Sequence, residues 1–94
     1  MLSNYTPIYL LGTHVRNATL SSAVALTVPT QARRFIFSVE TQNIRVTWGG
    51  VTPTTTLGIL FPAGDSYDIP VAPGQVLGII EVAASAVINY LFSG

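Results

Sequence analysis

The stretch Arg33–Trp48, RRFIFSVETQNIRVTW, contains two short apolar-rich runs on either side of a polar break. In both runs every second residue is apolar, and these positions are Phe35, Phe37, Val39, Ile44, Val46 and Trp48. A period of two is the pattern of a β-strand that buries one face. The break at Thr41–Asn43 ends in an asparagine, which tolerates turn geometry. We therefore predict a β-hairpin, with room for an exposed ion pair between Glu40 and Arg45 beside its turn.

The rest of the chain continues in the same manner, with short β-prone runs separated by turn residues. The breaks fall at 29–31, 49–56, 62–65, 70–74 and 83–85. Turn signals at intervals of about 8–12 residues are typical of a β-sandwich or β-barrel. Seven or eight strands fit in 94 residues. The predicted fold class is all-β, a small antiparallel β-sandwich that is jelly-roll-like and has an N-terminal arm or edge strand.

The predicted domain organisation is one β-sandwich domain over residues 18–94, preceded by an N-terminal arm or edge strand at residues 1–17, where the sequence pattern differs. That segment holds the apolar run Ile8, Tyr9, Leu10 and Leu11 between turn-forming residues. It fits either a first strand packed on the chain's own core or an arm exchanged with another subunit. An arm would need a partner for its apolar side chains, so these four residues are candidate interface residues.

The charge content is unusually low for a soluble domain. Charged residues are 9% of the chain, against about 25% in an ordinary soluble domain, and the formal net charge is zero. Lysine is absent, while 49% of the residues are hydrophobic. The surface is covered either by uncharged polar residues or by other protein, and we favour the second reading because exposed apolar patches mark interaction sites.

The sequence carries no recognisable catalytic, metal-binding or cofactor-binding constellation. It has no cysteine, one histidine (His14) and four carboxylates, whereas a zinc or iron site needs three or four ligands. Asp65 and Asp68 fit the capping of a turn better than half of a calcium site. We expect no catalytic residue, no metal, no cofactor and no enzymatic activity.

Nucleic acid and membrane partners are not expected. Phosphate binding draws on many cations, and this chain has four arginines and no net charge. The most apolar stretch, Val76–Phe92, contains Glu81 near its middle, which disfavours a membrane-spanning helix. No signal-peptide pattern is evident at the N-terminus. We expect Arg33, Arg34 and Arg45 to be charged contacts to a neighbouring subunit.

Residues Arg33 to Phe92 resemble the small virion proteins of tailed bacteriophages. The resemblance rests on the opening RRFIFSVETQNIRVTW, the glycine, proline and threonine loop GGVTPTTTLGILFPAGD, and the last apolar run AVINYLF. It covers about two thirds of the chain and leaves out residues 1–17. It implies a β-sandwich or jelly-roll module of the capsid decoration (cement) type, with no catalytic residue to carry over.

The function that this resemblance implies is that of a structural protein, which bridges and stabilises major capsid subunits. Its expected partners are the major capsid protein or another virion protein and further copies of itself, as a homo-oligomer for which we expect a trimer. The expected location is the virion, after synthesis in the host cytoplasm. The alternatives are a neck or tail component, and a carbohydrate- or receptor-binding module that uses Trp48 or Tyr67. A tryptophan on the apolar face of a strand favours a core position for Trp48.

Overall fold

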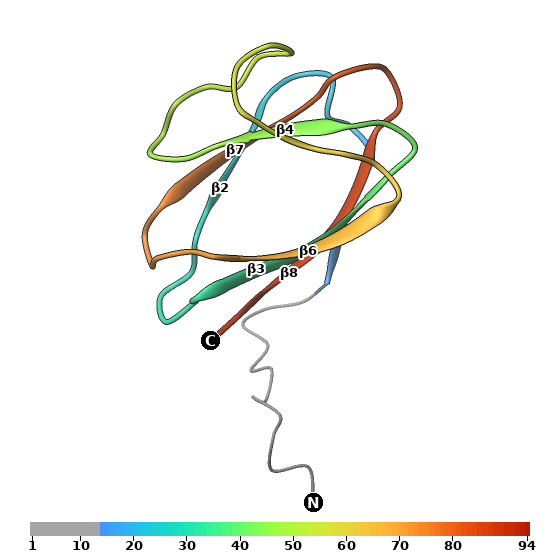
Figure 1. Cartoon of the computed structure of the whole chain (residues 1–94). Helices are drawn as coiled ribbons and strands as arrows, with labels where there is room; N and C mark the ends of the chain where they lie inside the picture. The colour runs from blue at the N-terminus through green and yellow to red at the C-terminus, as the bar shows by residue number, and fades with distance from the viewer. Residues whose placement is uncertain (1–13) are drawn as a thin grey trace, which may run out of the picture.

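The computed structural model describes residues 14–94, which form two four-stranded antiparallel sheets packed face to face (Figure 1). Eight strands build these sheets: β1 (Val15–Asn17), β2 (Val24–Thr27), β3 (Arg34–Glu40), β4 (Ile44–Thr47), β5 (Ile59–Phe61), β6 (Asp65–Pro70), β7 (Val76–Glu81) and β8 (Val87–Ser93). Sheet A has the order β1-β8-β3-β6, and sheet B has the order β2-β7-β4-β5. No helix, and so none that could cross a membrane, is found in the described residues.

The strand pairing is that of a jelly roll. β1 pairs with β8, β2 with β7, β3 with β6 and β4 with β5, so the chain is a nested antiparallel ribbon that turns back between β4 and β5. Rolling this ribbon brings β3 beside β8 and β4 beside β7, which closes the two sheets. The predicted all-β sandwich of jelly-roll type is confirmed.

The predicted hairpin at Arg33–Trp48 is wrong, because β3 and β4 lie in different sheets. Residues 41–43 carry the chain from one sheet to the other, and Thr41 has a φ of 68° there. The Glu40 carboxylate accepts a hydrogen bond of 2.5 Å from Asn89 Nδ2, on the neighbouring strand β8, in place of the expected pair with Arg45. Alternation of apolar and polar residues identifies the buried face of a strand, but it does not identify the strand that pairs with it.

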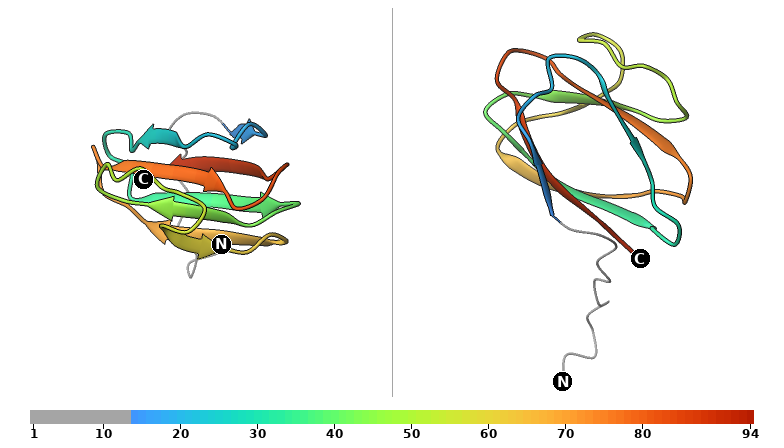
Figure 2. Two further views of the ribbon diagram at one scale, coloured as in Figure 1. Left: turned by 90° about the horizontal axis from the view of Figure 1, so that it is seen from above. Right: turned by 180° about the vertical axis from the view of Figure 1, so that it is seen from behind.

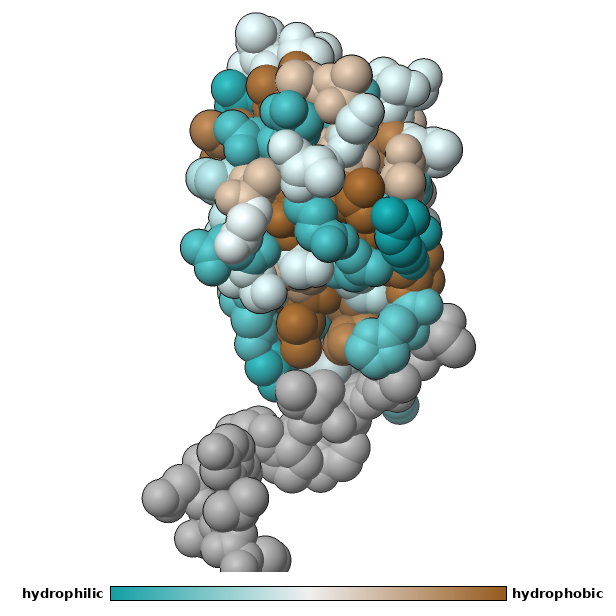
Figure 3. All heavy atoms as spheres, turned by 90° about the vertical axis from the view of Figure 1, so that its right-hand side faces the viewer, coloured by the Kyte–Doolittle hydropathy of each residue, from teal (hydrophilic) through white to brown (hydrophobic). Residues whose placement is uncertain are grey.

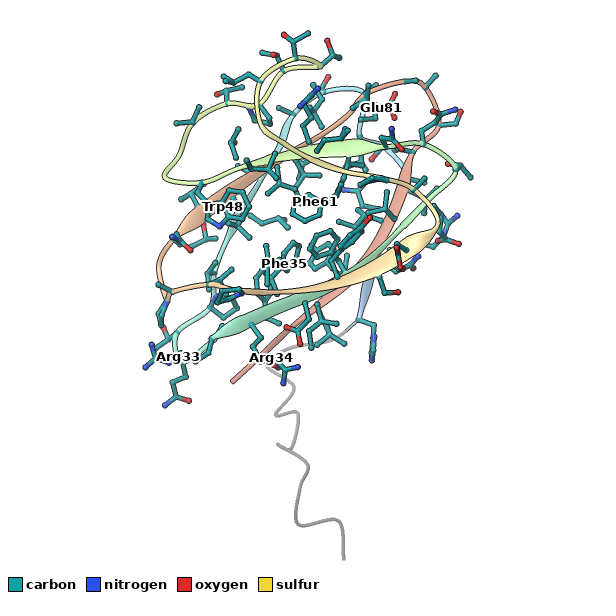
Figure 4. The ribbon with its side chains drawn as sticks, in the orientation of Figure 1. Arg33, Arg34, Phe35, Trp48, Phe61 and Glu81 are labelled. Carbon is teal, nitrogen blue, oxygen red and sulfur yellow. The ribbon has the colours of Figure 1, made fainter. Side chains whose placement is uncertain are left out.

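The apolar faces that the alternation identified do form the core. Phe35, Phe37, Val39, Ile44 and Val46 are each at most 2% exposed. The Phe35 ring lies 4.7 Å from that of Phe37 and 5.0 Å from that of Phe92, between centroids. Figure 4 shows Phe35 and Phe61 between the sheets. The core is thus an aromatic cluster of sheet A, joined by Phe61 of sheet B, that packs against aliphatic residues of both sheets.

The ends of the sheets also follow the sequence. β6, which ends at Pro70, is an edge strand, a position where the missing N–H of proline is tolerated. β8, which is apolar on both faces, lies between β1 and β3. β1 forms the other edge of sheet A, so residues 15–17 of the predicted arm or edge strand are an edge strand. The candidate interface residues at positions 8–11 lie outside the described residues.

Replacing Phe35 with alanine should lower the free energy of unfolding by about 3–5 kcal/mol, because it leaves a cavity under both sheets. The matched control is Ile36→Ala, on the same strand but on the half-exposed outer face, where we expect the smaller loss. Urea unfolding monitored by fluorescence of the single tryptophan measures both values. Equal losses in the two variants would contradict the assignment of the core.

Candidate functional site

The largest exposed apolar residues of the described chain gather around β5 and the loop before it. Val51 is 50%, Leu57 51% and Ile59 59% exposed. Together with half-buried Trp48 they line an open hollow of about 370 Å³, whose remaining lining residues are Val46, Thr47 and Gly58. We call Trp48, Val51, Leu57 and Ile59 the β5 apolar surface. A cluster of exposed apolar side chains is a candidate interaction surface.

The loop at residues 49–58 is folded onto the outer face of sheet B, at the top of Figure 1. Gly49 and Gly50, with φ of 72° and 79°, end β4 and turn the chain back. The Thr47 hydroxyl donates a hydrogen bond to the Val51 carbonyl. Pro53 is buried against Gly78 of β7, where an added Cβ would lie 2.5 Å from Pro53 Cδ. The loop is therefore seated where β7 has no side chain.

Arg45 fixes the other half of this loop. Its Nε donates to the Thr55 carbonyl and its Nη1 to the Gly58 carbonyl, both at 2.9 Å. The backbone N–H of Leu57 donates to Thr54 Oγ1 at 2.9 Å, which closes a tight turn. Arg45, expected at a subunit contact, thus binds carbonyls of its own chain and holds Leu57 and the start of β5 in place.

Of the other two candidate arginines, Arg34 begins β3 of sheet A and Arg33 directly precedes it, whereas Arg45 lies in sheet B. Arg34 pairs with Asp68 across β3 and β6: its Nε lies 3.1 Å from both carboxylate oxygens, and its Nη2 donates to Oδ2. Arg33 is exposed at the end of the sandwich nearest the C-terminus (Figure 4). The structure brings Arg33 and Arg34 near each other and places Arg45 in the opposite sheet.

The Arg34–Asp68 pair is the clearest electrostatic feature of the described residues. The hydrogen bond from the guanidinium holds the pKa of Asp68 below its ordinary value of 3.8, and it raises the pKa of Arg34. Burial raises the pKa of the Tyr90 phenol, and burial followed by the nearby Asp65 charge raises that of Tyr67. All these shifts follow from pairing, packing or a neighbouring charge.

The carboxylates and the histidine do not converge on a metal site in the described residues. His14 is exposed, and residues 14–94 contain no group of three or more histidines and carboxylates that could hold an ion. Asp65 is the first residue of β6, and its Oδ1 accepts a hydrogen bond of 3.2 Å from the N–H of the next residue, Ser66, which is a local bond but not the turn cap that we expected. Asp68 instead pairs with Arg34.

The two aromatic residues considered for sugar binding have different environments. The Tyr67 hydroxyl donates to the Pro62 carbonyl at 2.7 Å, and its ring lies 4.9 Å from that of Phe61. Trp48 packs against the core cluster but is half-buried, at the left end of the sandwich in Figure 4. The core position favoured for Trp48 is thus only partly realised, because one part of the side chain lines the hollow.

The end of the sandwich that faces away from Trp48 differs in character. Figure 3 shows hydrophilic and hydrophobic residues interspersed there, with no continuous apolar region. A hollow of about 490 Å³ is lined by polar residues that include Glu40, Thr41 and Asp65. This end of the sandwich therefore lacks an apolar cluster like the one around β5.

Sequence reasoning missed Val51, Leu57 and Ile59 as candidate functional residues. A signal was present, because no charged residue occurs between Arg45 and Asp65, although this stretch includes the short apolar run LGILF. Comparison with protein-family models, curated proteins and solved structures finds no match. The geometry of this chain therefore carries the functional argument.

Replacing Arg45 with methionine should lower the free energy of unfolding by about 1–2 kcal/mol, because two carbonyls lose a charged donor. It should also make the bond beside Leu57 more accessible to thermolysin, which cleaves next to apolar residues. Arg33→Met, at an exposed position, is the matched control and should change neither property appreciably. Equal resistance to cleavage in both variants would show that Arg45 does not hold the loop.

Replacing Asp68 with asparagine should make stability less dependent on pH in acid. The folded-state pKa of Asp68 is depressed, so the pair stabilises the fold above the ordinary pKa and loses this contribution as the pH falls through the folded value. The wild type should exceed Asp68→Asn in stability near neutral pH, and the difference should shrink below about pH 4. Urea unfolding from neutral to acidic pH measures it.

Arg34→Gln should remove the same pH-dependent contribution to the free energy of unfolding. The double variant with Arg34→Gln and Asp68→Asn should show no further loss of this contribution. A wild-type advantage over Asp68→Asn that stays constant down to the lowest pH would rule out the pairing as its source.

Proposed function

We propose that this chain is a non-enzymatic structural protein of a virus particle, of the capsid decoration or cement type. Its β5 apolar surface is the contact with a neighbouring polypeptide. The observation that carries this proposal is the exposure of Val51, Leu57 and Ile59, each half or more exposed, around one hollow. A solvated monomer gains nothing from such an arrangement, whereas a subunit of an assembly covers it.

Three further observations support the proposal. The charge content of 9% is low for an ordinary soluble domain, as we expect of a surface that other proteins largely cover. The jelly roll is an architecture common among viral capsid domains, although lectins use it as well. The resemblance to small tailed-phage virion proteins points in the same direction. Because a fold alone does not define a function, the apolar surface remains the decisive feature.

The chemistry of the hollow favours a protein partner over a sugar. Its lining residues carry no charged and no amide side chain. The hydroxyl of Thr47, which could have served a sugar, donates to the Val51 carbonyl. Carbohydrate recognition needs convergent polar groups that fix the orientation of the ligand. Apolar side chains of another polypeptide match this lining better.

The energy available at one such surface is small, and this accords with a cement protein. Burying a fully exposed aliphatic side chain contributes about 1.5–3 kcal/mol, so each half-exposed residue contributes about 1 kcal/mol. One contact of this size does not offset the cost of association. When a homo-oligomer makes several such contacts on a regular lattice, each further contact forms at a high effective concentration, and together they offset that cost. Binding to the folded state alone also stabilises the decoration protein.

In this mechanism the subunit bridges its neighbours with a rigid module. Exposed Arg33 stays available for a charged contact, while Arg34 and Arg45 serve the module itself through Asp68 and the loop carbonyls. The proposed partners are the major capsid protein or another virion protein, together with further copies of this chain in a trimer.

The direct test is quantitative mass analysis of particles purified from cells infected by the virus that encodes this chain. A copy number comparable with that of the major capsid protein supports decoration. A copy number equal to that of one neck or tail ring would reassign the protein to that position. Absence from purified particles would refute the proposal.

A binding experiment tests the surface itself. The double variant Leu57→Ser and Ile59→Ser should bind undecorated capsids at least about tenfold more weakly, a loss of about 1.4 kcal/mol or more. The matched control is Val15→Ser, which removes an exposed valine, 38% accessible, from the opposite edge of the molecule. Equal binding by both variants and the wild type would exclude the β5 apolar surface.

A further inference from the structure

We propose that the β5 apolar surface receives the segment Ile8-Tyr9-Leu10-Leu11 of a second copy of this chain. The copies then assemble by exchanging their N-terminal segments. This inference deepens the proposed function, on which it rests for the role of the surface, by naming the neighbouring polypeptide that covers it. The surface then supports capsid binding by joining copies whose weak contacts act together. Three observations support it: the open edge of β5, the reach of the chain before His14, and the chemistry of the hollow.

The first observation is the contrast between two neighbouring sheet edges. β6, the edge of sheet A, carries Asp65 and Asp68 and ends at Pro70, which are features that discourage strand addition. β5, the edge of sheet B, consists of Ile59, Leu60 and Phe61 and carries no charge. Ile59 and Leu60 are 59% and 42% exposed. An uncharged apolar edge accepts an extended segment by strand addition.

The second observation is the reach of the polypeptide. Figure 2 shows β1 and β2 at one side of the sandwich and β5 and β6 at the other. Neighbouring strands lie about 4.8 Å apart and packed sheets about 10 Å apart. A path from β1 along the outside of sheet A to β6 and then across to β5 is therefore about 25 Å long. Ile8 is six residues before His14 and can lie at most about 20 Å from it, and Leu11 at most about 10 Å. The segment therefore falls short of its own β5, whereas that of an adjacent copy does not.

The third observation is chemical complementarity. The hollow has a volume of about 370 Å³ and is lined by apolar side chains without charge. The segment at positions 8–11 has four apolar or aromatic side chains, also without charge. In an added strand, alternate residues point the same way, so Ile8 and Leu10 would enter the hollow beside Leu57 and Ile59.

The core gives no reason to keep this segment on its own subunit. Residues from 14–94 already bury Leu20, Val28, Phe35, Ile44 and Leu77 to 1% exposure or less. The side chains of residues 14–94 close this core, so the proposed exchange takes none of these residues from it. Because β1, which follows the segment in the chain, and β5 lie on opposite sides of the subunit, the proposed contact is heterologous, and such a contact closes into a ring or continues as a filament, depending on the rotation between copies. A ring agrees with the proposed trimer.

The absence of native cysteine allows a direct test with the full chain. Leu10→Cys and Ile59→Cys are prepared as two separate single-cysteine proteins, mixed and oxidised. We expect a disulfide-linked heterodimer on a non-reducing gel, because the proposed contact brings the thiols within bonding distance. The matched control replaces the second protein by Thr27→Cys, an exposed position on β2, the other edge of sheet B. It should give at least about tenfold less product.

The double variant with both cysteines in one chain distinguishes exchange from an internal contact. Under exchange it forms linked oligomers, and a linked monomer would overturn the proposal. A heterodimer yield no higher than that of the Thr27→Cys control would overturn it as well.

Light scattering provides the second measurement. Leu10→Asp and Ile59→Asp should each convert the oligomer to a monomer, whereas Val15→Asp should leave it intact. Circular dichroism checks that each variant keeps its β structure. A wild-type chain that is monomeric at micromolar concentration would refute the exchange.

The two proposals can fail independently. A chain found in particles without cross-linking between Leu10 and Ile59 would refute exchange and retain the structural role. Cross-linking between copies of a chain that is absent from purified particles would support exchange and refute the structural role in the particle.

Discussion

The structure depends on the aromatic contacts that join Phe35 and Phe37 to both sheets. The Phe35 ring stacks on that of Phe92, 5.0 Å away, which ties β3 to β8 within sheet A. The Phe37 ring meets the edge of Phe61 at 5.1 Å, which ties sheet A to β5 of sheet B. β5 is only three residues long and has one sheet neighbour, β4. Phe61 anchors it, so Ile59 is presented from a rigid position although it lies at an edge.

The few charges of the chain mostly act within the subunit. Arg45 uses its guanidinium on two loop carbonyls, Arg34 pairs with Asp68, and Glu40 accepts from Asn89. Charges used in this way do little to repel neighbouring proteins, and the formal net charge of zero adds no long-range repulsion. The low charge content and the apolar surface thus have a common consequence, because both permit close packing of subunits.

The sequence predicted the buried faces and the fold class but not the strand partners. Alternation in Phe35–Val39 and Ile44–Val46 identified core positions, since side-chain direction is a local property of a strand. The jelly roll separates these two strands into different sheets, and that choice depends on contacts distant in sequence, such as β3 with β8. The role of Arg45 was missed for the same reason, because its carbonyl partners belong to a loop whose path is set by Pro53 on Gly78. Exposed Leu57 and Ile59 lie in a sequence run that resembles a buried strand. Only the position of β5 at the edge of sheet B, which the sequence does not reveal, leaves these side chains exposed.

The apolar lining of the hollow would give the proposed contact its selectivity. Its lining residues carry no charged side chain, and the β6 carboxylate of Asp68 is paired with Arg34 on the other sheet. A partner segment with charged or unpaired polar groups would be desolvated against this lining without compensation. The proposed contact therefore favours uncharged apolar segments, such as that at positions 8–11. Exposed apolar surface of this sort carries a risk of aggregation, and the proposed exchange lowers that risk because it covers the surface.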